Sequence, residues 1–502
     1  MKEDNIFYYN DLCFIIKDKK TVTCILEYYE EGRYYCQQTL KGGLVIPSKA
    51  IDERNGKEYL VTEIGAEAFL DCKGLTSVFI PASVIKIGDY AFHGCNGLNS
   101  IVVDINNHVY DSRESCNAII ETETNTLIVG CNNTIIPSSV RTIADGAFWD
   151  CGGLTFIVIP KSVENIGLNA FYGCSGLTSI KVEEGNKKYD SRGECNALIE
   201  TANNTLIKGS NNAVIPSSVT KIEDGAFEGC SGLISVVIPD SVTEMGVSAF
   251  AGCMGLTEVK ISNSLKTIDE SAFYGCENLT EVTIPDSVTQ ICDLAFSGCT
   301  KLAVINIRNS VIDIWEDAFS NTAWFNNQPD GMVYARSVAY RYKGEMTDEI
   351  TSIKEGCKSI ADAAFKGCKK LKKVIMPDTV TAIGTEAFYG CNNLTSLILG
   401  NSVKLIGHHV FDGCKNLVSF VISNAETKIG FSPFGNCDNL KEIFCNIKNP
   451  QPCTLPTHGT TIYIPQGTLQ SYLETGIDKN MLVELSDEKM EHRIAELKRQ
   501  KI

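Results

Sequence analysis

The sequence predicts a mainly β protein, a solenoid of 23-residue coils with β-hairpin insertions and terminal caps. The segment from Leu256 to Cys276 is followed by a close copy that runs from Leu279 to Cys299. A Phe that follows Ala in most coils marks the repeat, at residues 69, 92, 148, 171, 227, 250, 273, 296, 319, 365, 388, 411 and 434. Self-similarity at about 20–29 residues with a Leu-x-x-Leu-x-Leu core is characteristic of leucine-rich repeat solenoids.

Each coil is expected to contain one strand that faces the core on one side only. In the coil at 233–239, Val236 and Ile238 alternate with outward-facing residues as in a β-strand. Pro239 follows them, and because proline cannot donate to a strand ladder it suits a strand end. The marker Phe should fill the interior. No part of the repeat shows the 3.6-residue period of a long helix, so the return side of each coil should consist of short turns or a single helical turn.

The repeat and its interruptions divide the chain into six segments. Residues 1–58 lack the repeat and alternate in short apolar runs, which favours an N-terminal β cap. The solenoid is expected over 59–319 and 355–445, with an irregular junction or hairpin at 320–354 and a C-terminal cap at 446–486. The charged tail at 487–502 should be helical, with a narrow apolar stripe formed by Met490, Ile494 and Leu497.

The two long gaps between marker Phe residues, from 92 to 148 and from 171 to 227, contain near copies of one 33-residue insertion. Apolar pairs separated by Asn-rich turns predict additional short strands there. Each copy carries a Tyr-Asp-Ser-Arg segment, at 110–113 and at 189–192. That segment is either a repeated ligand-binding corner or a turn whose Asp and Ser bond the local backbone, and its composition favours the turn.

The 46-residue gap between Phe319 and Phe365 holds the most aromatic irregular stretch of the chain. We expect a hairpin here, with Trp315 and Trp324 sealing the junction. The alternative is an exposed aromatic surface that binds a partner.

The cysteines follow the repeat. Of 22 cysteines, twelve stand three residues after a marker Phe, at 72, 95, 151, 174, 230, 253, 276, 299, 368, 391, 414 and 437. A small thiol at one fixed place per coil indicates a buried ladder of core positions. Metal ligation would need C-x-x-C pairs or His partners at short spacing, and the sequence has neither. We therefore expect reduced thiols.

Composition and motifs argue against several classes of function. A net charge of -16 without basic runs argues against nucleic-acid binding. No apolar run approaches the roughly 18 residues of a membrane span, and the start of the chain lacks the apolar region of a signal peptide. Phosphate-binding, zinc-protease, nucleophile-elbow and dinucleotide motifs are missing. The sequence therefore assigns no catalytic, cofactor-binding or metal-binding residues, and His408 and His409 are expected to face solvent.

The repeated segment Val-Thr-x-Ile-Gly-x-x-Ala-Phe-x-Gly-Cys-x-x-Leu-x-x-Val-x-Ile-Pro-x-Ser resembles the BspA-like leucine-rich repeat family of Bacteroides-type bacteria, over roughly residues 59–445. Tyr463-Ile464-Pro465 and the segment after it are similar to the usual C-terminal end of that family. The resemblance implies a right-handed solenoid, often displayed on the cell surface or secreted, with a binding role such as adhesion.

Candidate binding residues come from the strand position that alternates away from the core. That column is Phe79, Val102, Val158, Lys181, Val237, Lys260, Thr283, Asn306, Ile375, Ile398, Val421 and Phe444. Its two ends are apolar and its middle is polar, and Phe156 enlarges the N-terminal part. Exposed β-branched residues also suit strands for their propensity alone. Contiguous exposed apolar surface is nevertheless uncommon unless something covers it. We therefore expect partner contact at Phe79, Phe156, Val158, Val237, Ile375, Ile398 and Val421.

The predicted function is that of a non-enzymatic binding protein at the cell surface or secreted, with a protein or glycan ligand. The alternative is an intracellular structural or protein-interaction scaffold, which the many thiols favour because thiols persist best in a reducing compartment. An enzyme site inside an insertion would need a cluster of titratable groups, and the insertions show only isolated Asp, Arg and Glu. The sequence does not specify the ligand or the oligomeric state.

Overall fold

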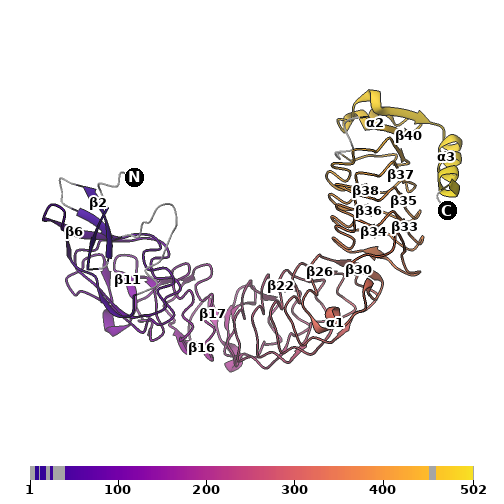
Figure 1. Cartoon of the computed structure of the whole chain (residues 1–502). Coiled ribbons are helices and arrows are strands. Elements are labelled where there is room, and N and C mark those ends of the chain that lie inside the picture. Colours follow the sequence, from indigo (N-terminus) through magenta and orange to yellow (C-terminus); the bar gives the residue numbers. More distant parts are fainter. Residues whose placement is uncertain (1–5, 11, 19–22, 27–39, 452–458, 501–502) are drawn as a thin grey trace. The chain divides into compact units, whose positions relative to one another are not determined.

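The computed structural model describes residues 6–10, 12–18, 23–26, 40–451 and 459–500 (Figure 1). The chain divides into two compact units, Met1–Ser262 with Gly275–Leu279 (unit 1) and Asn263–Tyr274 with Thr280–Ile502 (unit 2). In both units, short strands of successive coils pair in parallel at the 23-residue step of the repeat, as Val236 does with Val259 and Ile268 with Ile291. The predicted mainly β solenoid of 23-residue coils is confirmed.

In unit 1 the part of the chain that the structure describes forms six sheets. The N-terminal sheet has the order β1 (Ile6–Tyr9), β2 (Leu12–Asp18), β3 (Thr23–Leu26), β6 (Lys57–Ile64) and β5 (Lys49–Asp52), with β8 (Lys86–Ile87) paired to β6. The sheets that contain the coil strands are β4 (Gly42–Val45), β7 (Leu75–Ile80) and β9 (Ser100–Val103), then β14 (Phe156–Ile159) with β16 (Ser179–Val182), and β21 (Ser235–Val237) with β23 (Glu258–Lys260).

The other two sheets of unit 1 hold the duplicated insertions. The first has β10 (Tyr110–Asp111), β11 (Ile119–Glu121), β12 (Thr126–Val129), β13 (Thr142–Ile143) and β15 (Asn165–Ile166). The second has β17 (Tyr189–Asp190), β18 (Leu198–Glu200), β19 (Thr205–Lys208), β20 (Lys221–Ile222) and β22 (Glu244–Met245). Each insertion is thus a set of short antiparallel strands whose last member pairs in parallel with the next coil.

The described residues of unit 2 form four sheets and three α-helices. Its coil strands form β25 (Glu281–Thr283) with β27 (Val304–Asn306), and a seven-stranded sheet of β31 (Ile350–Ser352), β33 (Lys373–Ile375), β35 (Ser396–Ile398), β37 (Ser419–Ile422), β39 (Glu442–Cys445), β40 (Thr461–Pro465) and β41 (Leu482–Leu485). The second strands of the coils form β24 (Thr267–Ile268), β26 (Gln290–Ile291) and β28 (Asp313–Ile314), and a sheet of β29 (Gly331–Ala335), β30 (Val338–Lys343), β32 (Ser359–Ile360), β34 (Ala382–Ile383), β36 (Leu405–Ile406) and β38 (Lys428–Ile429). The helices are α1 (Ala323–Asn326), α2 (Leu469–Glu474) and α3 (Asp487–Gln500).

A column of stacked phenylalanine rings runs through the core of each unit. All 13 marker Phe are buried, as predicted. In unit 1 the rings of Phe227 and Phe250 stack with centroids 4.7 Å apart, and in unit 2 those of Phe273 and Phe296 stack at 5.2 Å with an angle of 9° between their planes. The identical position of the ring in each coil therefore keeps neighbouring coils in register.

The ladder cysteines have a hydrogen-bonding role in addition to packing. The thiol of Cys299 donates to the carbonyl oxygen of Phe273, one coil earlier, at 3.1 Å, and Cys391 donates in the same way to Phe365. Ten of the twelve ladder thiols are buried, and Cys368 and Cys437 are half-buried. A side chain as small as Ala would fit this position but could not donate to that carbonyl, and the serine hydroxyl is more polar than a thiol. Cysteine therefore combines a small apolar volume with a weak donor.

The return side of each coil is made of turns, as the sequence predicts. Two residues before the marker Phe, the backbone adopts a positive φ, for example 55° at Ser248, 54° at Ser271 and 58° at Gly225. This conformation costs non-glycine residues free energy, so it persists only where the packing of the coil imposes it. One long helix lies outside the repeat, α3 at the C-terminal end of the described chain, in the tail where a helix was predicted.

The interruption after Phe319 is a helical turn followed by a β-hairpin. Thr322, which replaces the ladder Cys, caps α1 by accepting a hydrogen bond from Phe325 N, and β29 pairs with β30 in antiparallel register. Trp324 packs edge-to-face on Phe319 with centroids 5.3 Å apart, as expected of a residue that seals the core. Trp315 does not seal it, because its ring is partly exposed and its Nε1 donates to Asp313. The fully buried Tyr340 takes that place.

We expect Phe273→Ala to lower the free energy of unfolding by about 3–5 kcal/mol, the range for large buried aromatic side chains. The ring is fully buried and its loss leaves a gap beneath Phe296. Because coils contact mainly their neighbours, the loss should be local and split the unfolding transition, which calorimetry can detect. The adjacent, exposed Tyr274→Ala is the matched control and should change stability by less than about 1 kcal/mol. Equal effects of the two substitutions would contradict this account.

The accessibility of the ladder thiols should differ from coil to coil. Burial raises the pKa of the half-buried Cys368 thiol to about 11 and that of the fully buried Cys391 thiol still further. In the native protein we expect a thiol reagent to label Cys368 and Cys437 before Cys391 and Cys414, and all cysteines to react once denaturant is added. Peptide mass spectrometry reads out both steps. Disulfides among most of the twelve ladder positions would overturn the packing role.

Candidate partner-binding surface

The strand residue that alternates away from the core forms what we call the outer row. In unit 1 it runs in register from Val45 to Phe79 and Val102, then from Val158 to Lys181, and from Val237 to Lys260. The flanking strand positions, such as Ile157 and Ile159, are buried. Alternation along the strands therefore places the row on the outer face, on the side assumed from the sequence.

The predicted residues of unit 1 lie on this face with different exposure. Phe156 and Val237 are exposed, and Phe79 and Val158 are half-buried among their row neighbours. Phe156 occupies the neighbouring column, where it pairs with Ser179. The structure thus brings Phe156, Val158 and their neighbours to one apolar surface, while their role in partner contact stays a prediction.

Sequence reasoning missed Val45 of the outer row and two exposed residues, Ile135 and Val214, that hold the equivalent place in the repeat. Val45, Ile135 and Val214 are highly exposed, Ile135 to 74% and Val214 to 69%. Ile135 and Val214 belong to the inserted segments, and each precedes an Ile-Pro pair, at 136–137 and 215–216, as the row residues of ordinary coils do. That Ile-Pro pair was the available signal. Val45 stands in the same relation to Ile46-Pro47, inside the segment assigned to the N-terminal cap, so the coil sheet already begins at β4.

In unit 2 one predicted row residue is exposed and another is covered. Ile375 is 47% exposed, and the side chain of Ile398 lies outside the described part of the chain. Val421, which we expected to be available to a partner, is only 3% exposed, so that prediction is wrong. Helix α3 lies over this end of the row, and its Met490 and Ile494 pack against Val421 and Phe444.

The middle of the row is polar, as predicted. In unit 2, Asn306 donates through Nδ2 to Glu281 Oε1 at 2.8 Å and to Thr283 Oγ1 at 3.3 Å. Thr283 and Asn306 border a shallow hollow of about 410 Å³ that is also lined by Asp286, Arg308 and Arg336. The surface therefore changes from hydrogen-bonding groups here to aliphatic groups at Ile375.

The Tyr-Asp-Ser-Arg segments are structural turns. In the first copy, Tyr110 OH accepts from Ile87 N, Ser112 Oγ accepts from Val103 N, and Arg113 donates to Asp111, Asn125 and Ser139. The second copy repeats every one of these contacts at the corresponding positions of its own insertion. Because all four side chains bond within the chain, this geometry supports the turn rather than the ligand-binding corner.

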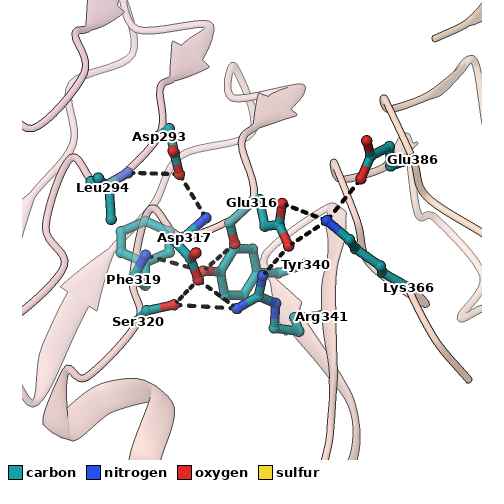
Figure 2. Close-up of polar contacts among 10 residues, drawn as sticks. All are labelled: Asp293, Leu294, Glu316, Asp317, Phe319, Ser320, Tyr340, Arg341, Lys366 and Glu386. Carbon is teal, nitrogen blue, oxygen red and sulfur yellow. Dashed lines mark hydrogen bonds and ion pairs between the residues drawn. The ribbon is translucent and has the colours of Figure 1, made fainter. Parts of the chain in front are cut away.

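A charged cluster surrounds the hairpin after Phe319 (Figure 2). Arg341 Nη1 lies 2.7 Å from Asp317 Oδ1 and Nη2 lies 3.4 Å from Glu316, while Lys366 Nζ joins Glu316 at 3.3 Å to Glu386 at 2.8 Å. Beneath them, Tyr340 OH accepts from Phe319 N at 3.1 Å and donates to the Glu316 carbonyl at 3.2 Å. Each carboxylate faces a cation, so the cluster fastens the hairpin to its neighbouring coils.

A second cluster in unit 1 is aromatic. The rings of His93 and Trp149 stack at 5.3 Å, those of Trp149 and Tyr172 stack at 4.3 Å, and Tyr172 OH donates to Glu228 Oε1 at 2.6 Å. Desolvation lowers the pKa of His93 to about 4, which keeps its imidazole neutral in the stack. Both faces of the central Trp149 ring are therefore occupied and cannot stack on a sugar.

Six copies of the BspA type leucine rich repeat region match this chain, over residues 62–190, 206–325 and 337–451. These residues make up well over half of the sequence. The chain belongs to the BspA-type leucine-rich repeat family. The family and fold are those of repeat proteins that generally act as non-enzymatic binding scaffolds.

Solved structures of bacterial leucine-rich repeat proteins are similar to this BspA-type chain. A leucine rich cell surface protein from Faecalibacterium prausnitzii is 28% identical over 64% of this chain and 93% of its own, with a TM-score of 0.40. A leucine-rich repeat protein from Bacteroides ovatus is 22% identical over 96% and 100%, with a TM-score of 0.28. The pneumococcal vaccine antigen PcpA is 17% identical over 96% and 98%, with a TM-score of 0.25. No curated protein matches the chain.

His408 of this BspA-type chain shows how a polar side chain fits into the repeat. His408 is exposed, as expected, but its Nδ1 also accepts the backbone N–H of Phe431 at 2.9 Å. Asp145 and Asp362 accept the equivalent N–H of the next coil, from Leu168 and Thr385. Over the described residues, no group of three or more His, Cys, Asp or Glu could hold a metal ion. Nor does any helix described there have the length and apolar composition needed to cross a membrane.

We expect Tyr340→Phe to lower the free energy of unfolding by about 1–3 kcal/mol. The substitution keeps the buried ring but removes the hydroxyl that accepts from Phe319 N, so a buried N–H loses its partner. Chemical denaturation measures the change, and Tyr274→Phe, at an exposed ring, is the control. An unchanged stability in Tyr340→Phe would show that this hydroxyl does not support the hairpin.

Proposed function

We propose that this protein is a non-enzymatic, adhesin-like binding protein, displayed at the cell surface or secreted, that captures a protein partner through the outer row. The observation that carries the proposal is the apolar character of the row in unit 1. Val45, Val102 and Val237 of the row are exposed there, as is Phe156 in the neighbouring column. Val45, Phe79 and Val102 lie in register on adjacent strands, and contiguous exposed apolar residues mark interaction sites, whereas isolated ones do not.

A protein partner is favoured over a glycan by the chemistry of this row. Its members are mainly aliphatic, and aliphatic side chains offer no hydrogen bonds to sugar hydroxyls. The aromatic rings of His93, Trp149 and Tyr172 contact each other, so both faces of the central Trp149 ring are occupied. Membership of a family with surface-protein relatives supports the location, and the F. prausnitzii protein is described as a cell surface protein.

The alternative is an intracellular scaffold. It is favoured by the thiols, because 19 cysteines form no disulfide and most of them are buried. Fractionation of the producing cell, with antibody detection of the protein on intact cells, separates the two locations.

We expect the double substitution Phe156→Lys and Val158→Lys to leave the fold intact and to reduce adhesion at least fivefold. The measurement is attachment of bacteria, or of protein-coated beads, to host cells or host matrix. Two ammonium groups on this face of β14 disfavour contact with an apolar partner. The core residues beneath it, Ile157 and Ile159, are not substituted. Circular dichroism and thermal melting check the fold.

Thr155→Lys is the matched control for that experiment, since it adds charge to an exposed position of the same coil, outside the row. It should leave adhesion near the unsubstituted level. Unfolding of the double variant would mean that its row residues support the core, and unaltered adhesion would mean that this part of the row is not the binding surface.

A further inference from the structure

Helix α3 shows which kind of element fits on the outer row. It lies beside the seven-stranded sheet of unit 2 (Figure 1). Met490 and Ile494, one helical turn apart, pack against Val421 and against Phe444, which is 1% exposed, with Tyr463 and Leu485 at the margin. In the neighbouring column, Ser419 is also buried. Small and apolar row residues therefore allow an amphipathic helix to lie directly on this face.

The same row continues past the residues that α3 covers. In register, Phe444 pairs with Val421, Val421 with Ile398, and Ile398 with Ile375. Ile375 is 47% exposed, and Ile350, one strand further in the neighbouring column, is 55% exposed and pairs with Lys373. We call Ile375, together with Ile350 and Lys373 of the neighbouring column, the open end of the row. It is continuous with the surface that already holds a helix.

A strand cannot be added along β33, which is hydrogen-bonded to β31 on one side and to β35 on the other; β31 is the edge strand of this sheet. A partner that lies on the face at Lys373 and Ile375 must therefore use side chains, as an amphipathic helix does in a groove.

The open end itself carries the ammonium group of Lys373, although the chain as a whole has a net charge of -16. Lys370 and Lys372 flank it and pair with Glu345 at 3.4 Å and Glu349 at 2.7 Å. Lys373 lies between them and Ile375 and takes part in no ion pair among the described residues. This local charge favours an acidic partner.

We propose that the open end docks an acidic amphipathic helix of a partner protein, laid along the outer row in line with α3. Its apolar residues, spaced i and i+4 like Met490 and Ile494, contact Ile350 and Ile375, and a carboxylate pairs with Lys373. The proposal rests on the proposed function in taking the outer row as the binding face, and it adds the structure and charge of the partner.

The test uses the full-length chain and three labelled peptides built on residues 486–500. The native peptide carries equal numbers of acidic and basic side chains. In the acidic peptide Lys489 and Arg493 are replaced by Glu, and in the basic peptide Glu488 and Glu491 are replaced by Lys, so all three keep the Met490 and Ile494 stripe. By fluorescence anisotropy we expect the acidic peptide to bind at micromolar concentration and at least tenfold more tightly than the basic one. Added salt should weaken that binding.

Variants of the protein locate the binding. Ile375→Glu and Lys373→Glu should each weaken binding of the acidic peptide at least tenfold. Lys415→Glu, on an exposed turn outside the row, should leave that binding unchanged. Absence of binding, or equal binding of the acidic and basic peptides, overturns the proposal. Binding that survives Ile375→Glu but strengthens in Ile494→Glu also overturns it, because the peptide then takes the place of α3. Since the adhesion experiment probes unit 1, these failures would leave the proposed function standing.

Discussion

The contact between the marker Phe of one coil and the Phe and Cys of the next is the interaction on which the rest of this structure depends. The ring of Phe273 stacks on that of Phe296 at 5.2 Å, and the carbonyl of Phe273 accepts the thiol of Cys299 in the following coil. Apolar stacking sets the distance between neighbouring coils. The hydrogen bond from thiol to carbonyl sets how one coil is rotated relative to the next. Parallel strand pairing at the 23-residue step, and with it the alignment of the outer row, follows from that register.

The interruptions show how much deviation this column tolerates. Where an insertion precedes Phe148 and Phe227, a glycine replaces the stacked ring, because any side chain at Gly130 or Gly209 would collide with the Phe ring. After Phe319, the edge of Tyr340 takes the place of the next Phe at 5.4 Å. In each case the exposed face of the ring is still covered. Because coils depend mainly on their neighbours, an interruption needs only this local repair.

Much of this arrangement could be predicted from sequence because it repeats. Alternation in Val236-Val237-Ile238 predicts which side chain faces outward, and the fixed spacing of Phe and Cys predicts their burial. Ile135 and Val214 were missed because the inserted coils lack the marker Phe, although they retain the Ile-Pro pair. The covering of Val421 could not be predicted. The stripe of Met490 and Ile494 implies that α3 must bury one face, but nothing in its sequence specifies which surface it covers.

Separation of the core from the outer row explains how such a chain can acquire a binding surface. Every strand devotes alternate positions to the core, so substitutions in the row, such as Lys260 beside Val237, leave Val236 and Val259 in place. The row can therefore be apolar in one stretch, polar at Thr283 and Asn306, and apolar again at Ile375 without a change of fold. Helix α3 exploits this freedom at the C-terminal end, where it buries Val421 and Phe444. The uncovered stretches have the same backbone and similar side chains, so burying them would release apolar surface from water in the same way.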